Sequence, residues 1–457
     1  MSRVGQAPDR PATRRDVPYA VPSWVDPVVA SATGAIGGPV GRHAVIGARA
    51  LTGVAVALVG MAAVLLSLGV WQKGHCLMKG WSTPDQFWRA CYSDLPVVYV
   101  SSPLAARDLP WEGAIPSTQP PLSGLVMWLL ALVSPTSGQG LRAQQSVFVL
   151  WVLLALVLLV VAVVAAVALS PRRPWQAAHL AASPLLITLA LVSTDLLGIA
   201  LTVTALLAWR RGRSWPAGAL LGAALLVRPF PLVFLLAMVI LAVRRGEGLR
   251  AGRTVVGAAL GALAVVVPLL AVERQGLTAV RDWWGQGAGY GALQMVPRLV
   301  GLEALPGVTT AVAVGGWLVA VVVGVLAARR HAWRAPGLPQ LAALMLLVVA
   351  LTAPSLSVQS GLWVLPLLAL SNRRWWEHLA WAAVETIHFV ATWLHIAFAS
   401  DPGRGLPPEA YAVVVVARAA GWAWILWRVW EDPAPGPGVR VRDARPAASP
   451  PLVQGAG

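Results

Sequence analysis

Residues 147–169 read "VFVLWVLLALVLLVVAVVAAVAL", an unbroken run of apolar side chains without a single charge. A helix of this length is long enough to cross the hydrocarbon core of a bilayer, which takes about 20 residues. Residues 255–272 and 307–328 have the same character. Each of the three stretches predicts a transmembrane helix, and together they predict a polytopic membrane protein built only of α-helices.

The composition of the whole chain agrees with this class. Of its 457 residues 57% are apolar and 12% are charged, whereas about 25% of the residues in a soluble domain are charged. We therefore predict a bundle of about 12 transmembrane helices within residues 44–430. Its helices are expected near residues 44–70, 121–134, 147–169, 176–193, 195–209, 217–243, 254–272, 307–328, 338–352, 360–371, 379–398 and 411–430.

Both ends of the chain differ from this central region. Residues 1–43 and 431–457 are rich in Pro, Arg, Gly and Ala. Such segments cannot bury enough apolar surface to fold. We expect two disordered tails, both in the cytoplasm.

The formal net charge of +16 does not indicate a nucleic-acid-binding protein. The arginines stand in short clusters between apolar segments, and such clusters mark the cytoplasmic side of a membrane protein. They predict the plasma (inner) membrane as the location and place the long polar segment 71–119 on its outer face. The clusters lie within residues 210–213, 244–253, 329–334 and 373–374.

This outer loop, residues 71–119, is the longest polar insertion between apolar segments. Long loops are usually either functional or disordered, and the many Trp and Tyr residues here favour a loop packed on the membrane interface. Cys76 and Cys91, the only cysteines of the chain, both fall within it. On the outer side two cysteines this near in sequence can form a disulfide; the alternative is two unpaired thiols.

Two apolar segments are too short for the number of passes they must make. Residues 214–243 lie between two arginine clusters, so both ends should be cytoplasmic, yet two full passes need about 40 residues. Pro229 and Pro231 favour a break near "RPFP" (228–231). The same reasoning predicts a break in 335–371 around "APSLSVQSG" (353–361). Because irregular backbone at membrane depth needs protein or water around it, both breaks point to one internal cavity.

The direction of residues 121–134 stays open at this point. A full pass there would place the arginines of "SPRRPW" (170–175) outside the membrane. Either residues 121–134 are partly re-entrant, or this cluster is an exception to the positive-inside rule.

Asp195 and Arg228 stand inside apolar segments, where a charge is costly and usually faces the bundle interior or water. Asp195 either caps a helix start on the outer side or faces the cavity. The guanidinium of Arg228 suits phosphate recognition through paired donors. Its alternative role is a structural pairing with Asp195 or with backbone carbonyls.

Glu385, His388 and His395 are spaced to share one helix face. We interpret them as interhelical hydrogen-bonding groups, because a metal site would need further ligands and no second histidine cluster exists. No phosphate-binding loop or dinucleotide motif is present. We therefore predict neither a metal nor a cofactor.

Five stretches, taken in order, carry a resemblance to a known family. The chain resembles the actinobacterial integral-membrane glycosyltransferases of family 87, which include polyprenol-phosphate-mannose-dependent α-mannosyltransferases. The stretches are "CLMKGWSTPDQFWRACYSDLPVVYVSSPLA" (76–105), "QPPLSGLVMWL" (119–129), "SPLLITLALVSTDLLGIAL" (183–201), "LLVRPFPLVFLL" (225–236) and "SVQSGLWVLPLLAL" (357–370), and "IGGPVGRHA" (36–44) is similar to the segment before the family's first helix.

The resemblance implies a GT-C architecture whose first outer loop supplies a catalytic acidic residue, which here is Asp94. It implies inverting transfer of a sugar, with mannose as the expected one, from a polyprenyl monophosphate to a glycolipid or polysaccharide acceptor. Asp94 would take the proton of the attacking hydroxyl, and Arg228 and Arg107 would neutralise the leaving phosphate. Asp195 and Gln359 are the remaining residues that we expect at the substrate.

The chain departs from the family pattern in three stretches. Ser193 and Thr194 stand where relatives often carry Asn-Trp, Thr118 where they often carry Glu, and Pro354 where they often carry Lys. These departures leave two alternatives open: the enzyme uses a different acceptor or donor, or it has lost activity. The alternative function, from a different class, is a translocase or binding protein for lipids or lipid-linked glycans, which would use the cavity without a base.

Overall fold

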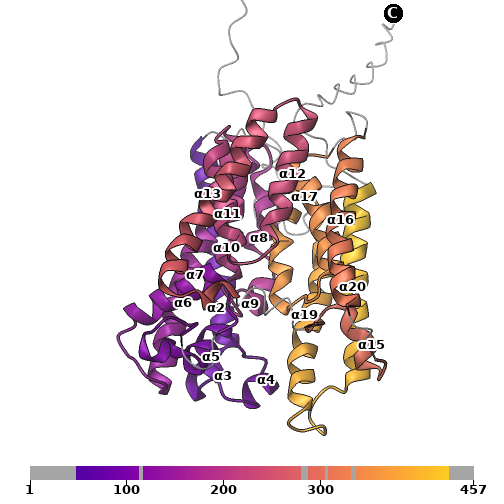
Figure 1. The fold of residues 1–457 in the computed structure, drawn as a ribbon. Coiled ribbons are helices and arrows are strands. Elements are labelled where there is room, and N and C mark those ends of the chain that lie inside the picture. The colour runs from indigo at the N-terminus through magenta and orange to yellow at the C-terminus, as the bar shows by residue number, and fades with distance from the viewer. Residues whose placement is uncertain (1–47, 113–116, 279–286, 304–306, 331–335, 432–457) are drawn as a thin grey trace, which may run out of the picture.

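The computed structural model describes residues 48–112, 117–278, 287–303, 307–330 and 336–431. Within these ranges every regular element is a helix (Figure 1). The predictions for residues 1–43, for "IGGPVGRHA" (36–44) and for the tail after Glu431 lie outside the described residues.

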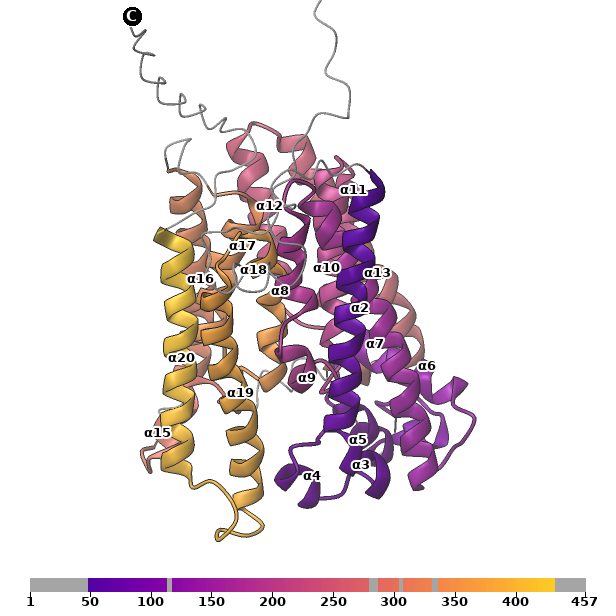
Figure 2. The ribbon, with the colours of Figure 1, turned by 180° about the vertical axis from the view of Figure 1, so that it is seen from behind.

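Six helices in the described ranges are long and apolar enough to cross a membrane, which is consistent with a multi-pass membrane protein. Seen from the front and from behind, they run roughly side by side along the molecule (Figures 1 and 2). The predicted number of about 12 is not confirmed, because the remaining apolar segments form shorter helices. The six are α2 (Ala48–Gln72), α7 (Leu141–Leu169), α13 (Gly248–Val272), α16 (Val308–Ala328), α19 (Trp375–Phe398) and α20 (Pro408–Glu431).

The shorter helices form three hairpins, each broken in the middle of the bundle. The predicted break near residues 228–231 is confirmed, because α11 ends at Leu225 and α12 begins at Pro231. The break near 353–361 is confirmed as well. The hairpins are α8 (Ala178–Ala181) and α9 (Leu185–Leu189) with α10 (Asp195–Arg210), α11 (Ser214–Leu225) with α12 (Pro231–Arg244), and α17 (Leu338–Thr352) with η6 (Val358–Trp363) and α18 (Leu365–Leu370).

Helix α6 (Pro121–Val133) starts in the middle of the bundle and ends at the loop side. The Leu122 N–H donates to the Leu226 carbonyl in the second break, at 3.0 Å. Just beyond the other end of α6, the carbonyl of Ser134 accepts a hydrogen bond from Arg107 in the loop 71–119, at 2.9 Å. Of the two alternatives for residues 121–134, the structure therefore has the partly re-entrant one.

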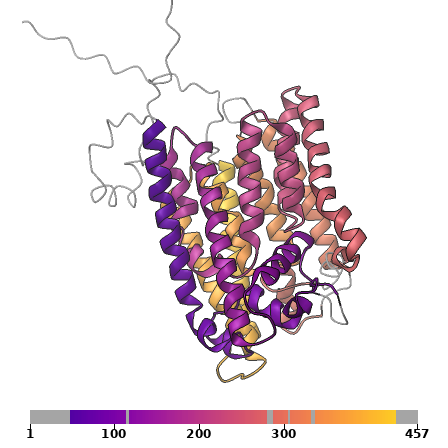
Figure 3. The same ribbon diagram turned by 90° about the vertical axis from the view of Figure 1, so that its left-hand side faces the viewer.

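The arginine clusters gather at one end of the bundle. Arg210 donates to the Ala168 carbonyl at the end of α7, at 3.0 Å. Arg250 bonds the Trp209 carbonyl at 2.6 Å, and Arg330 bonds the Trp430 carbonyl at 2.9 Å. These bonds join the ends of α7, α10, α13, α16 and α20, and the loop 71–119 lies at the opposite end (Figure 3).

The described part of the loop 71–119 is folded into short helices. Its elements are α3 (Gly74–Lys79), α4 (Asp85–Trp88), α5 (Asp94–Ser101) and η2 (Pro103–Ala106). A disulfide joins Cys76 to Cys91, with Cα atoms 5.9 Å apart. Trp81, Tyr99 and Trp111 are buried inside the protein, and the Trp81 ring lies 5.0 Å from that of Phe148 in α7, whereas Trp71 is 81% exposed. The buried rings therefore pack against the helical bundle, and the packing of the loop on the membrane interface stays a prediction.

Glycines let α11 and α13 touch backbone to backbone. A Cβ added at Gly222 would lie 1.9 Å from the Ala258 carbonyl oxygen, and one at Gly261 would lie 2.1 Å from that of Ala219. Small residues allow such close helix approach within membranes. This contact fixes the α11–α12 hairpin, and with it the break that carries Arg228, against a full-length helix.

Candidate active site

The three hairpin breaks meet at the carboxylate of Asp195. Arg228, in the second break, donates from Nε at 3.1 Å and from Nη2 at 3.2 Å. Trp363, at the end of η6 in the third break, donates from its indole nitrogen at 2.7 Å. The hydroxyl of Ser193 is a further donor. Asp195 is only 1% exposed, and a buried carboxylate is tolerated only with such partners.

The contacts of Asp195 and Arg228 distinguish between the alternatives predicted for each residue. Asp195 is the first residue of α10, and its carboxylate pairs with Arg228 instead of capping the free N–H groups of later turns. The structural pairing foreseen for Arg228 therefore exists. Its side chain nevertheless stays 17% exposed, and within the described part of the chain no hydrogen bond engages Nη1.

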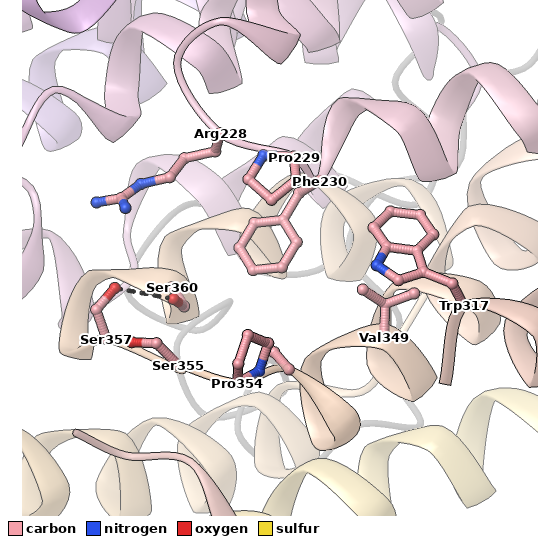
Figure 4. A pocket seen from close by; sticks show the side chains of 10 residues that line it. Arg228, Pro229, Phe230, Trp317, Val349, Pro354, Ser355, Ser357 and Ser360 are labelled. Carbon is pink, nitrogen blue, oxygen red and sulfur yellow. Dashed lines mark hydrogen bonds between the residues drawn. The ribbon is translucent and has the colours of Figure 1, made fainter. Parts of the chain in front are cut away.

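Arg228 borders a small pocket with a cavity volume of about 20 Å³ (Figure 4). Most of the wall is apolar, and the opposite side carries three serine hydroxyls. Two of them, those of Ser357 and Ser360, lie 3.2 Å apart. The lining residues are Arg228, Pro229, Phe230, Trp317, Val349, Ala353, Pro354, Ser355, Ser357 and Ser360.

Asp94 reaches this region although it belongs to the loop 71–119. Its backbone N–H donates to the Val192 carbonyl at 2.7 Å, and the hydroxyl of Ser93 donates to the Leu191 carbonyl at 2.7 Å. Both carbonyls belong to the first break, directly before Asp195. The start of α5 is therefore docked on the segment that leads into the buried carboxylate.

The surroundings of Asp94 favour a carboxyl group that titrates near neutrality. Burial raises its pKa from 3.8 to about 6. The charge of Arg228, a hydrogen bond from Tyr92 and the charge of Lys73 act in the opposite direction, and the charge of Asp195 raises the pKa further. Asp94, Asp195 and Arg228 thus form one electrostatic cluster of two carboxylates and a guanidinium.

The other predicted site residues lie at different distances from this cluster. Gln359 is buried in η6, between the pocket-lining Ser357 and Ser360. Arg107 donates to the Ser134 carbonyl next to the loop-side end of α6, and its own carbonyl accepts from Trp128. The described contacts of Arg107 are therefore with α6 and not with Asp94 or Arg228.

A second buried ion pair shapes the pocket wall from the side of α19 and α20. Arg418 donates to both oxygens of Glu385 at 2.9 Å and also binds the carbonyls of Leu356 and Ser357. Trp422 donates to Glu385 at 2.6 Å. Glu385 thus makes the interhelical bonds predicted for it, and the pair holds the third break in place.

Sequence reasoning missed Trp363 and Lys73 as members of the site. Trp363 donates a hydrogen bond to Asp195. The sequence feature that could have indicated this role is a tryptophan directly after the predicted break at 353–361. Lys73 is fully buried and donates to the Tyr92 carbonyl at 2.8 Å. The sequence feature that could have indicated Lys73 is its position directly after the first long apolar segment.

These elements define a helical membrane protein with a charged cluster beside an apolar pocket. Residues 118–358 match glycosyltransferase family 87, and because this is more than half of the chain, the protein belongs to that family and is a glycosyltransferase. No curated protein and no solved structure matches the chain. The matched region contains Asp195 and Arg228, whereas Asp94 precedes it.

Proposed function

We propose that this glycosyltransferase transfers a mannosyl group from a polyprenyl monophosphate to a hydroxyl of a cell-envelope glycolipid or polysaccharide. The transfer takes place on the outer face of the plasma membrane, on a GT-C-type scaffold, with inversion at the anomeric carbon. Asp94 is the general base. The observation that carries this proposal is the docking of the Asp94 backbone on the first break, three residues before Asp195, where the charge of Arg228 acts on its carboxyl group.

The pocket supports a lipid-linked donor. A polyprenyl phosphate joins one phosphate to a long apolar chain, and the pocket joins one guanidinium to a largely apolar wall formed by residues such as Phe230, Trp317 and Val349. Arginine binds phosphate through directed, charge-assisted hydrogen bonds. Nη1 of Arg228 is the donor left for this purpose, since Nε and Nη2 are used by Asp195.

The distribution of charge supports the outer face. The arginine-rich end of the bundle is the cytoplasmic end by the positive-inside rule, and the loop 71–119 lies at the other end. The disulfide between Cys76 and Cys91 fits this side, because disulfides persist in oxidising compartments.

The chemistry is a single displacement. The acceptor oxygen attacks the anomeric carbon from the face opposite the phosphate, and the bond between that carbon and the phosphate oxygen breaks. Asp94 takes the proton of the acceptor hydroxyl, while Arg228 stabilises the charge of the departing lipid phosphate. The positive charge that develops on the sugar ring is shared with the ring oxygen, as in glycoside hydrolysis.

The proposal is tested by incubating purified protein with radiolabelled donors and envelope lipids. Polyprenyl-phosphate mannose should yield a labelled product of opposite anomeric configuration, whereas polyprenyl-phosphate glucose and a nucleotide-linked mannose should not. Transfer from the nucleotide-linked sugar would overturn the proposed donor. Binding of lipid-linked sugars without transfer to any acceptor would favour the translocase or binding protein.

A further inference from the structure

Lys73 is a fully enclosed lysine at the point where α2 meets the loop 71–119. Its ammonium nitrogen donates to the Tyr92 carbonyl at 2.8 Å and lies 5.2 Å from the ring centroid of Phe389 on α19. A buried ammonium group is costly unless other groups compensate its charge. One carbonyl and one aromatic ring compensate the positive charge only in part, so a negatively charged group nearby would stabilise it further.

The nearest acidic group along the chain from the Tyr92 carbonyl is Asp94, and Lys73 acts on it through its charge and through the backbone that it binds, not through a described hydrogen bond. Tyr92, which Lys73 binds, lies two residues before Asp94, and Lys73 and Asp94 interact through their charges. The groups that act on Asp94 are Arg228, the Tyr92 hydroxyl, Asp195 and Lys73. Because Arg228 is already hydrogen-bonded to Asp195, Lys73 is the cation in this set without a carboxylate of its own.

The covalent structure of the loop keeps Lys73 in this position. Lys73 is followed by α3, and α3 is joined through Cys76 to Cys91, the residue before Tyr92. Trp81 also donates to the carbonyl of Cys91, at 3.0 Å. The two segments that carry Lys73 and Asp94 are thus fastened together on the loop side.

We propose that Lys73 is a positioning residue for the base: it holds the Tyr92–Asp94 segment through the Tyr92 carbonyl, and its charge keeps the Asp94 carboxylate ionised. This inference rests on the proposed role of Asp94. Lys73 does not touch substrate, and its effect on the reaction passes entirely through Asp94.

The protonation behaviour of the two groups supports this role. Burial lowers the pKa of Lys73 from 10.5 to about 7, and the charge of Asp94 acts against that change. Below about pH 7 the ammonium form is present and favours the ionised form of Asp94, whose pKa is about 6. Removal of the ammonium group must therefore raise the pKa of Asp94.

The test is the pH dependence of kcat/KM for mannosyl transfer in wild-type protein and in Lys73→Met, which keeps most of the side chain's length without its charge. We expect the acid limb of the Lys73→Met profile to move to higher pH; a shift of about one pH unit is about a 10-fold loss of kcat/KM well below pH 6, about a 5-fold loss at pH 6 and no loss in alkaline solution. Lys79→Met is the matched control, because Lys79 is the only other lysine and is exposed. Its profile should superimpose on that of the wild type.

Two outcomes overturn the inference while the proposed function stands. One is a Lys73→Met profile with the wild-type acid limb, and the other is an equal loss at every pH, which would show a purely structural role. Lys73→Arg covers the case in which Lys73→Met does not fold: it keeps a positive charge throughout, so an acid limb shifted upward would contradict the proposal. If Asp94→Asn retained transfer, the proposed function itself would fail, whatever Lys73 showed.

Discussion

The guanidinium of Arg228 binds the carboxylate of Asp195 through Nε and Nη2, at 3.1 and 3.2 Å, across 33 residues of sequence. The pair joins the first hairpin break to the second, and Trp363 adds the third. These hydrogen bonds fix the orientation of the Arg228 guanidinium, whose Nη1 is not used by Asp195, and Arg228 lines the pocket.

Arg228→Lys should reduce transfer strongly. Lysine keeps one positive charge but cannot bind Asp195 and a phosphate with the same fixed geometry. We expect kcat to fall about 100-fold, the usual scale for losing a preorganised donor at a developing charge. The measurement is the steady-state rate at saturating donor, with Arg211→Lys at the exposed arginine-rich end as the control. An unchanged kcat would remove Arg228 from the reaction.

The rate of transfer should depend on pH through Asp94. Only the ionised carboxylate accepts a proton, so kcat/KM should rise tenfold per pH unit in acid and level off above about pH 6, the pKa set by burial of Asp94. The measurement is kcat/KM between pH 4.5 and 8.5 with a fixed donor. A limb near pH 4 would indicate a carboxylate in bulk water and contradict the partly buried position of the base.

Gly198→Ala should damage the cluster without touching a charge. A Cβ at this position of α10 would lie 2.7 and 2.9 Å from the Trp363 ring, which would have to move away from Asp195. We expect a destabilisation of about 1–3 kcal/mol from overpacking, together with lower activity. Thermal unfolding and transfer assays measure both effects. Gly53→Ala in α2 is the control, since nothing lies within 4 Å of its added Cβ.

Loss of the disulfide should destabilise the loop that carries Asp94. Cys76 and Cys91 are 15 residues apart, and closing a loop of that length stabilises a protein by about 3 kcal/mol in the chain-entropy model. The Cys76→Ser/Cys91→Ser protein should unfold at a lower temperature, and reductant should lower the unfolding temperature of the wild type alone. If reductant had no effect on the wild type, the bond would contribute nothing to stability.

Glu385→Gln should be among the most destabilising single substitutions in α19. It leaves the Arg418 guanidinium buried without a counter-ion, which costs about 3–5 kcal/mol when one partner of a buried pair is removed. Glu247→Gln, in a partly exposed pair with Arg250, is the matched control and should cost no more than about 1 kcal/mol. Denaturant unfolding compares the two; equal effects would contradict the role assigned to the buried pair.

Local chemistry explains the parts of the fold that the sequence predicts well. The break beside Pro229 and Pro231 follows from missing backbone donors and from the length of 214–243, and α17 occupies the predicted residues 338–352. The predicted count of about 12 transmembrane helices is not confirmed, because several apolar segments that the sequence suggests as spans are short. In the structure they are half-length helices packed against full-length ones, a choice that depends on tertiary contacts.

The sequence predicts individual residues of the candidate site but not which of them lie next to one another. Asp94 and Arg228 were each expected at the substrate, but the contact of Asp94 with Val192 spans almost 100 residues and has no local signal. Arg107 was expected beside the phosphate, yet it binds the carbonyl that follows α6. Charged residues in apolar segments and the family motifs indicate candidate site residues. Which of these residues come into contact depends on how the three hairpin breaks pack together in the bundle.

The most direct measurement is mannosyl transfer by Asp94→Asn compared with Asp108→Asn, an exposed aspartate of the same loop. Both proteins should fold and bind polyprenyl-phosphate mannose. We predict that Asp94→Asn loses transfer by at least about 100-fold, the lower range for a general base, while Asp108→Asn keeps the wild-type rate. Wild-type transfer by folded Asp94→Asn would contradict the assignment of Asp94 as the base.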